Sequence, residues 1–282
     1  MTTKISDVLY DKPGKRLEHT QGYYYRDENG KIFEARSLAQ KEAARARQFA
    51  ESRSDESPYV LNAMKRLNFV IDVLTPAQCG YLLMLACHLN YENIIVKSRN
   101  NQMPMTYAEM RSSLRLTKKK STFSEFLSAC INHGIIVKTE GGAYRIASLF
   151  HFRGNAEGEA VVKAYMQRVK EVYRKVKPED IGLIYRMLPY VHRTTNALCA
   201  NPDETVPESI RKFNRKQLAE AVDVSPEVIS RKVKSMKFDG DPVFAKVTPG
   251  DGESFYMLNP SVFYRGKGAP DATLRAMFGG KV

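Results

Sequence analysis

Three consecutive lysines, Lys118 to Lys120, stand at the start of a predicted helix. The amino-terminal end of a helix carries a partial positive charge, so cations there do not stabilise it. A bound phosphate accounts for these lysines better than a solvated run of charge does. Hydroxyl side chains follow within the next turn and add hydrogen-bond donors. The contact residues expected in this segment are Lys118, Lys119, Lys120, Ser121, Thr122 and Ser124.

A second basic segment lies between Arg211 and Lys237. Within it, Arg231 carries a planar guanidinium whose parallel donors match the two major-groove acceptors of guanine. Glu227 either accepts a hydrogen bond from cytosine or stabilises the amino-terminal end of its own helix. The residues expected to contact nucleic acid in this segment are Arg215, Ser225, Ser230, Arg231 and Lys234.

Further basic residues lie on or beside predicted β-hairpins. Lys138 and Arg145 belong to the first hairpin and Lys246 to the second, where they would contact phosphates or enter a minor groove. An Arg-Gly pair follows each hairpin, and its arginine, Arg153 or Arg265, is a candidate for the same contacts. We interpret the aromatic residues around these pairs as core residues.

These segments belong to an internal repeat. The first copy contains Tyr144-Arg145-Ile146 followed by the segment 150–154. The second contains a similar pattern, Tyr256-Met257-Leu258 followed by 262–266, at a constant offset (256 − 144 = 112). A repeat of this length is too long for a solenoid unit and indicates two copies of one small domain. Upstream of each hairpin the sequence predicts two helices joined by a short turn.

The helix ends are marked by capping residues. Thr75-Pro76 is typical of a helix start, and Thr106 with Glu109 matches a capping box. In the first copy, Gly134 is expected to end the helix at 118–133 in a left-handed conformation. In the second copy, Asn214 with Gln217 and Ser225-Pro226 give the equivalent helix-start signals. Helix, turn, helix and hairpin in this order are typical of a winged helix.

The expected fold is therefore mostly α with small β wings (α+β): two tandem winged helix-turn-helix domains joined by a helix. The second copy contains an extra polar loop at 196–209. Two alternatives remain for the helix between the copies, packing within the chain or a seam for a homodimer. The expected parts are an N-terminal extension (1–58) with a hairpin around 27–30 and a helix at 37–49, winged-helix domain 1 (59–156), a connecting helix (157–177), winged-helix domain 2 (178–268) and a C-terminal tail (269–282).

The composition limits the class of protein. The chain has 282 residues, 43% of them hydrophobic, and a formal net charge of +13, which favours a polyanionic partner. The four cysteines show no disulfide or zinc spacing, and no phosphate loop, nucleophile elbow or metalloprotease motif is present. We expect no enzymatic activity, no cofactor and no metal. No apolar run reaches about 18 residues, so we expect no membrane association. We expect a location in the cytoplasm of a bacterial host.

The close of each copy resembles a known family. The segment from Phe255 to Gly266 is similar to the end of RepL-type plasmid replication proteins, and the MarR-like phage regulators share the general architecture. The resemblance covers about 60–155 and 178–268. The first copy departs from the pattern at Ala147-Ser148, where the second has Asn259-Pro260. The resemblance implies tandem winged helices that bind DNA.

These observations lead to one expectation and three alternatives. We expect sequence-specific binding of double-stranded DNA by a transcriptional regulator of a phage or mobile element. Phosphate affinity would come mainly from the first copy, and base discrimination from the second. The alternatives are a replication initiator that binds origin repeats and replication proteins, a module that docks on RNA polymerase, and single-stranded DNA binding through stacked tyrosines.

Overall fold

The computed structural model describes residues 17–21, 24–27, 32–34 and 58–278, except for positions 157, 239, 251 and 271. The chain divides into two compact units, Met1–Asp55 and Glu56–Val282. The described residues form nine α-helices and several small antiparallel sheets, so the expected α+β class is confirmed.

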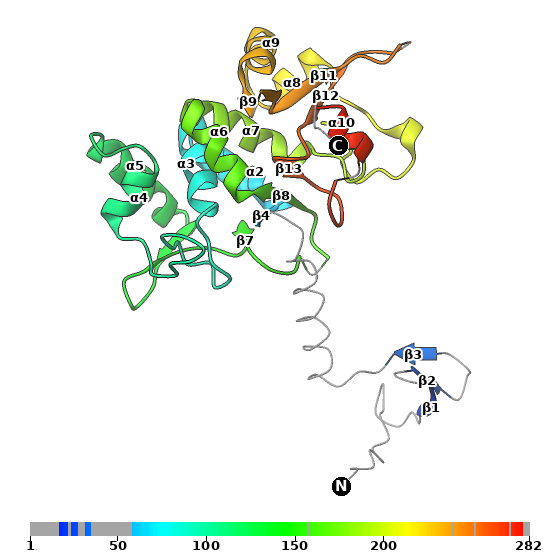
Figure 1. Cartoon of the computed structure of the whole chain (residues 1–282), viewed down its shortest axis with the longest axis horizontal. Helices are drawn as coiled ribbons and strands as arrows, with labels where there is room; N and C mark the ends of the chain where they lie inside the picture. Colours follow the sequence, from blue (N-terminus) through cyan, green and yellow to red (C-terminus); the bar gives the residue numbers. More distant parts are fainter. Residues whose placement is uncertain are drawn as a thin grey trace. The chain divides into compact units, whose positions relative to one another are not determined.

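The first unit contains a three-stranded antiparallel sheet in the order β1-β2-β3 (Figure 1). The pairing of β2 with β3 confirms the hairpin predicted around 27–30, whereas β1 is an additional strand. The helix expected from Ser37 to Phe49 lies outside the described residues. The strands are β1 Leu17–Gln21, β2 Tyr24–Asp27 and β3 Ile32–Glu34.

A four-stranded antiparallel sheet in the order β13-β8-β4-β7 lies at the centre of the second unit (Figure 1). The two inner strands come from different halves of the chain, and a short outer strand covers the free edge of each. The strands are β4 Tyr59–Ala63, β7 His151–Phe152, β8 Val161–Tyr165 and β13 Phe263–Tyr264.

Each inner strand leads into a pair of helices. Strand β4 continues into α2 (Met64–Val73) and α3 (Pro76–Ala86), and β8 continues into α6 (Met166–Lys175) and α7 (Pro178–Met187). Prolines at the first helical position start both α3 and α7. Because α3 is apolar on nearly every face, it must be covered all round, and α7 from the other half supplies much of that cover.

Each half then forms the same succession of smaller elements. In the first half they are α4 Tyr107–Ser113, α5 Lys120–Asn132, β5 Ile136–Lys138 and β6 Tyr144–Ile146. In the second they are α8 Arg215–Ala221, α9 Pro226–Ser235, β11 Phe244–Val247 and β12 Phe255–Leu258. Isolated bridges, Ile94 with Arg145 and Ala197 with Met257, add a third extended segment to each hairpin.

The remaining elements lie mostly in the second half. They are the 3₁₀ helices η1 Leu188–Tyr190 and η2 Pro207–Ser209, the paired strands β9 Lys237–Phe238 and β10 Asp241–Pro242, and the helix α10 Ala272–Ala276. Leu274 and Phe278 pack with Tyr165 and Tyr264 in a small apolar cluster, so the segment after β13 is anchored to the central sheet.

One hydrophobic core runs through both halves of the second unit. It includes Leu82 and Phe126 from the first half and Ile184, Leu218 and Ile229 from the second, all of them buried. The two repeats therefore share a core instead of enclosing one each.

The segment expected as a connecting helix (157–177) differs from that expectation. Residues 161–165 form strand β8, and only 166–175 are helical. The apolar residues that gave the helical spacing include Val162, which faces the core from the strand. The inner face of α6 (Val169, Val172 and Tyr173) is buried within this chain, which favours packing inside the molecule over a seam for a homodimer.

Candidate nucleic-acid interface

The first helix pair is built on a reciprocal cap. The Thr106 hydroxyl accepts a hydrogen bond from the Glu109 amide at 3.2 Å, and the Glu109 carboxylate accepts from the Thr106 amide at 2.8 Å. Lys97, 2.8 Å from Glu109, and then the bonds to Thr106 lower the pKa of that carboxyl to about 2. The predicted capping box is confirmed and fixes where α4 begins.

The turn between α4 and α5 depends on an unusual backbone conformation. Arg115 has a φ of 60°, in the left-handed region that residues with side chains seldom occupy. Its guanidinium donates to the carbonyls of Tyr173 at 3.2 Å and Arg174 at 3.1 Å. The turn is therefore attached to the carboxy-terminal end of α6.

Helix α5 buries one face and exposes the other. Phe123, Phe126 and Cys130 are buried, whereas the lysines and two of the three hydroxyls are exposed and Thr122 is half-buried. The helix begins at Lys120, so Lys118 and Lys119 precede its first turn, and that turn contains no acidic residue. The exposed members of the predicted set are Lys118, Lys119, Lys120, Ser121 and Ser124.

The second helix pair repeats this construction. The Asn214 side chain accepts from the Gln217 amide at 3.1 Å, and Gln217 accepts from the Asn214 amide at 3.0 Å. Asp223 occupies the position in the turn that Arg115 has in the first pair, with a φ of 54°. Arg186 of α7 donates to the Val222 carbonyl at 3.2 Å and lies 3.5 Å from the exposed Asp223 carboxylate, so this turn is attached to the central helices.

Helix α9 is also two-faced. Ile229 is buried, and Arg231 and Lys234 are exposed on the opposite side with Ser225 at the cap. Arg215 of α8 donates to the Ser230 hydroxyl at 3.3 Å, and that hydroxyl donates to the Pro226 carbonyl at 3.3 Å. The structure thus brings Arg215 of α8 into contact with Ser230, the residue that precedes the exposed Arg231.

The acid at the start of α9 has local partners. The pKa of Glu227 is lowered by hydrogen bonds from its own backbone amide and from Ser225, with a smaller contribution from Arg215. This arrangement favours the simpler interpretation of Glu227, as a group that stabilises the end of its helix.

The hairpins place their basic residues on different faces. Lys138 pairs with Tyr144, and Lys246 pairs with Tyr256, so the two lysines occupy equivalent positions in the two halves. Arg145 pairs with Val137 and therefore points to the opposite face of its hairpin from Lys138. All three side chains are exposed.

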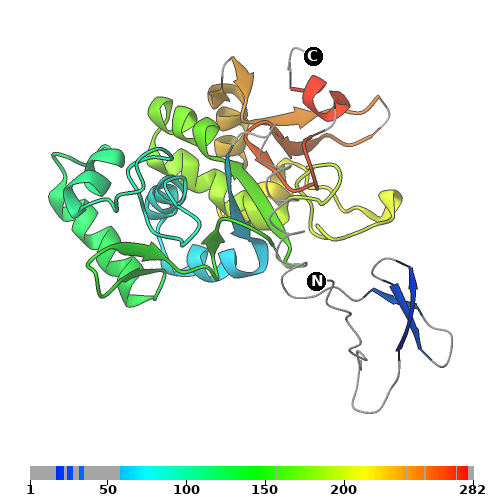
Figure 2. The same cartoon turned by 60° about the horizontal axis from the view of Figure 1, so that its bottom comes forward.

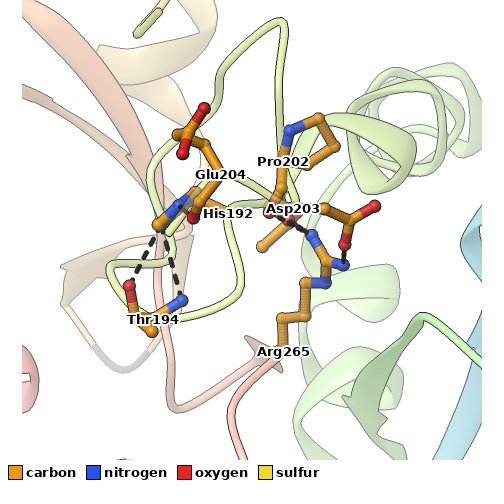
Figure 3. Close-up of polar contacts among 7 residues, drawn as sticks. His192, Thr194, Pro202, Asp203, Glu204 and Arg265 are labelled. Atoms are coloured by element: carbon orange, nitrogen blue, oxygen red, sulfur yellow. Dashed lines mark hydrogen bonds and ion pairs between the residues drawn. The ribbon is translucent and has the colours of Figure 1, made fainter. Parts of the chain in front are cut away.

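Arg265 is a buried structural clamp. Its guanidinium donates to the carbonyls of Val191 at 2.8 Å and Pro202 at 2.5 Å and pairs with the Asp203 carboxylate, and its side chain is only 5% exposed (Figure 3). Beside it, His192 Nε2 donates to the Glu204 carbonyl at 2.9 Å. These bonds fix the polar loop at 201–204 to the residue that follows β13 and to the chain at 191–192.

Arg153 has the equivalent position in the first half. It lies 4.1 Å from the centroid of the Tyr91 ring, donates to the Tyr91 hydroxyl at 3.0 Å, and approaches the Leu89 carbonyl at 3.4 Å. Both arginines are occupied within the chain, so we leave them out of the candidate interface.

A charged junction lies between the two helix pairs. Lys232 of α9 is 2.5 Å from Asp180 of α7, and both side chains are mostly buried. A cavity of about 380 Å³ at this junction is lined by Arg115, Lys175, Lys177 and Lys232, among others. Asp180 also lines this cavity, so four basic side chains surround one carboxylate.

The four cysteines and His151 are buried. Burial raises the pKa of Cys79 and Cys87 to about 12, so these thiols remain protonated at neutral pH. His151 lies between Asn62 and Tyr185, with 2.9 Å to each from its two ring nitrogens. Because the Asn62 oxygen can only accept, Nδ1 of His151 donates and Nε2 accepts from Tyr185. All three belong to the core.

Sequence patterns miss residues whose role depends on distant partners. Arg115, Lys232 and Arg186 hold the helix pairs in place, but nothing in the local sequence distinguishes them from exposed basic residues. The left-handed residue of each turn could have been located from the sequence, since Arg115 and Asp223 both follow the last apolar residue of a short capped helix.

No family model, curated protein or solved structure matches the chain. Across the ranges that the structure describes, no helix has the length and hydropathy needed to cross a membrane.

Proposed function

We propose that each half of the second unit is a winged helix-turn-helix and that the chain is a non-enzymatic, sequence-specific binder of double-stranded DNA. In this proposal it is a transcriptional regulator of a phage or mobile element, acting in the bacterial cytoplasm. The observation that carries the proposal is the repeated helix pair, in which the second helix exposes donors on one face and buries the other.

The element order supports the winged-helix assignment. In each half a core helix is followed by a short extended segment, two helices and a hairpin, and one hairpin strand bridges back to the extended segment. The second helix of such a pair enters the major groove in helix-turn-helix proteins. Helices α5 and α9 have that position here.

The exposed side chains support contact with DNA. Lys118 to Lys120 supply positive charge ahead of α5, where the backbone amides of the first turn also favour a phosphate. Arg231 on α9 has the geometry for two hydrogen bonds to guanine. The first half would therefore supply mainly phosphate affinity, and the second half would supply more of the base discrimination.

The experiment is a salt titration of binding by the intact chain, measured by fluorescence anisotropy on a duplex recovered by selection. The slope of log K against log salt is negative, and each lost phosphate contact reduces its magnitude by about 0.9. The double variant Lys118→Ala/Lys120→Ala should therefore bind more weakly and show a slope shallower by about 2.

A matched control is Lys65→Ala/Arg66→Ala, which removes two exposed cations from α2. It should leave the slope near that of the unchanged chain. Circular dichroism and thermal melting establish that each variant is folded. Equal loss of affinity from both pairs would show that net charge, and not the α5 surface, drives binding.

A further inference from the structure

The central sheet of the second unit has an internal two-fold symmetry. Strands β4 and β8 are antiparallel, with Tyr59 opposite Tyr165 and Ala63 opposite Val161. The outer strands follow the same symmetry, since Leu61 pairs with Phe152 and its counterpart Lys163 pairs with Tyr264. A rotation that exchanges the two halves therefore preserves the register of all four strands.

The helices that cross beneath the sheet obey the same rotation. A Cβ atom on Gly80 would lie 2.1 Å from the Pro178 carbonyl oxygen, and one on Gly182 would lie 1.7 Å from the Pro76 carbonyl oxygen. Gly80 corresponds to Gly182, and Pro76 corresponds to Pro178. The contact is thus reciprocal, as in the interface of a symmetric dimer.

The same backbone bonds recur in the helix pair and hairpin of each half. Ile95 donates to Tyr144 at 2.9 Å, and in the other half Leu198 donates to Tyr256 at 2.8 Å. At the two turns, the bonds from Leu116 to Arg111 and from Val224 to Ala219 measure 3.0 and 2.9 Å. Figures 1 and 2 place α4 and α5 on one side of the crossing helices α3 and α7, and α8 and α9 on the other.

Such symmetry restricts the DNA that both halves can read at once. A duplex has local two-fold axes perpendicular to its length, and binding sites of two-fold proteins are inverted repeats for that reason. Two modules related by a two-fold rotation contact half-sites that run in opposite directions along the duplex. Half-sites that run in the same direction require modules related by translation along the duplex. Both modules are fixed to one shared core, the first through the bonds of Arg115 to α6 and the second through the Lys232–Asp180 contact with α7.

We propose that a single copy of this chain binds an imperfect inverted repeat in double-stranded DNA, with α5 reading one half-site and α9 the other. The half-sites differ in sequence because the helices differ: α5 follows three lysines, and α9 carries Arg231 and Lys234. This inference rests on the proposed function and adds the arrangement of the site and the number of copies bound.

The experiment starts from a duplex selected from a random pool by the intact chain. Four versions are compared in the same buffer: the selected duplex, one with a half-site reversed in place to give a direct repeat, one with that half-site scrambled, and one with five base pairs inserted between the half-sites. Anisotropy gives the affinity, and native mass spectrometry gives the number of chains on each duplex.

We expect one chain on the selected duplex, and an affinity at least tenfold lower for each of the other three, because several base contacts are lost together. Footprinting should show that Arg231→Ala loses protection at one half-site, and that Lys118→Ala/Lys120→Ala loses it at the other. Arg231→Lys serves as a second variant that keeps the charge.

Three results would each overturn the inference. They are undiminished binding to the direct repeat, two chains bound to the selected duplex, and loss of footprint protection at the same half-site in both variants. Failure of the proposed function has a different signature, because no duplex would then be enriched or bound.

Discussion

At the scale of single residues, burial separates two kinds of arginine that look alike in the sequence. Arg231 is exposed on α9, whereas Arg265 is enclosed by three acceptors. The residue types and their basic surroundings were predictable. The sequence could not predict which of the two guanidinium groups is enclosed by the chain, because the acceptors of Arg265 come from positions more than sixty residues away.

The Arg231→Ala variant tests base recognition. Loss of a bidentate contact to guanine should weaken binding to the selected duplex by about 1–3 kcal/mol and remove discrimination at one base pair. Lys234→Ala should instead weaken binding to all duplexes to a similar extent. Competition against duplexes substituted at single positions measures both effects. An Arg231→Ala variant that still discriminates at every position would contradict the assignment.

His151 predicts how stability depends on pH. Burial lowers its pKa from 6.5 to about 3, so the folded chain keeps this imidazole neutral. Between these values the unfolded chain binds a proton that the folded chain does not. The free energy of unfolding should therefore fall as pH decreases below about 6.5, by up to about 1.4 kcal/mol per pH unit from this residue. His88, with a pKa near 4, contributes in the same direction.

His151→Gln retains a donor for Asn62 and an acceptor for Tyr185, and it should make the pH dependence shallower. His133→Gln, on an exposed histidine, is the matched control and should leave the dependence unchanged. Urea unfolding at several pH values between 7.5 and 4.5 measures the slopes. Identical slopes for His151→Gln and the unchanged chain would exclude His151 as the cause.

At the scale of helices and strands, local patterns were sufficient where the stabilising contact is local. Both capping boxes, the left-handed Gly134 and the two hairpins agree with the sequence, because their partners lie within a few residues. Strands β4 and β8 were not predictable in this way. Each is five residues long, and its pairing partner is about one hundred residues distant.

The helix crossing gives the sharpest prediction at this scale. Gly80→Ala or Gly182→Ala places a methyl group against a carbonyl oxygen and forces α3 and α7 apart, so each should cost about 3 kcal/mol or more of stability. Gly141→Ala, which has open space around it and an ordinary φ, should be nearly neutral. Denaturant unfolding compares the three. Full stability in both crossing variants would show that the close approach is not required.

At the scale of the whole molecule, the repeat forms one body. Sequence similarity located two copies, but it did not reveal that their first strands and helices form a shared centre. That centre depends on the pairing of β4 with β8 and on the reciprocal glycine contact.

Separate expression of the halves tests the shared core. Residues 56–156 without the rest would expose the apolar surface of α3 that α7 covers, so this fragment should be unstable or aggregated. Residues 158–278 should behave in the same way, and mixing the two should restore cooperative unfolding. Thermal melting followed by circular dichroism provides the comparison. Two fragments that each unfold cooperatively would contradict a shared core.

The central claim is sequence-specific binding to double-stranded DNA, and an unbiased selection tests it most directly. The intact chain would be incubated with a random duplex pool at physiological salt, and the bound fraction amplified and sequenced over several rounds. We predict enrichment of one motif, with affinity at least about 10³-fold above that for a scrambled duplex. Bound duplexes without a common motif, or affinities equal for selected and scrambled sequences, would contradict the account.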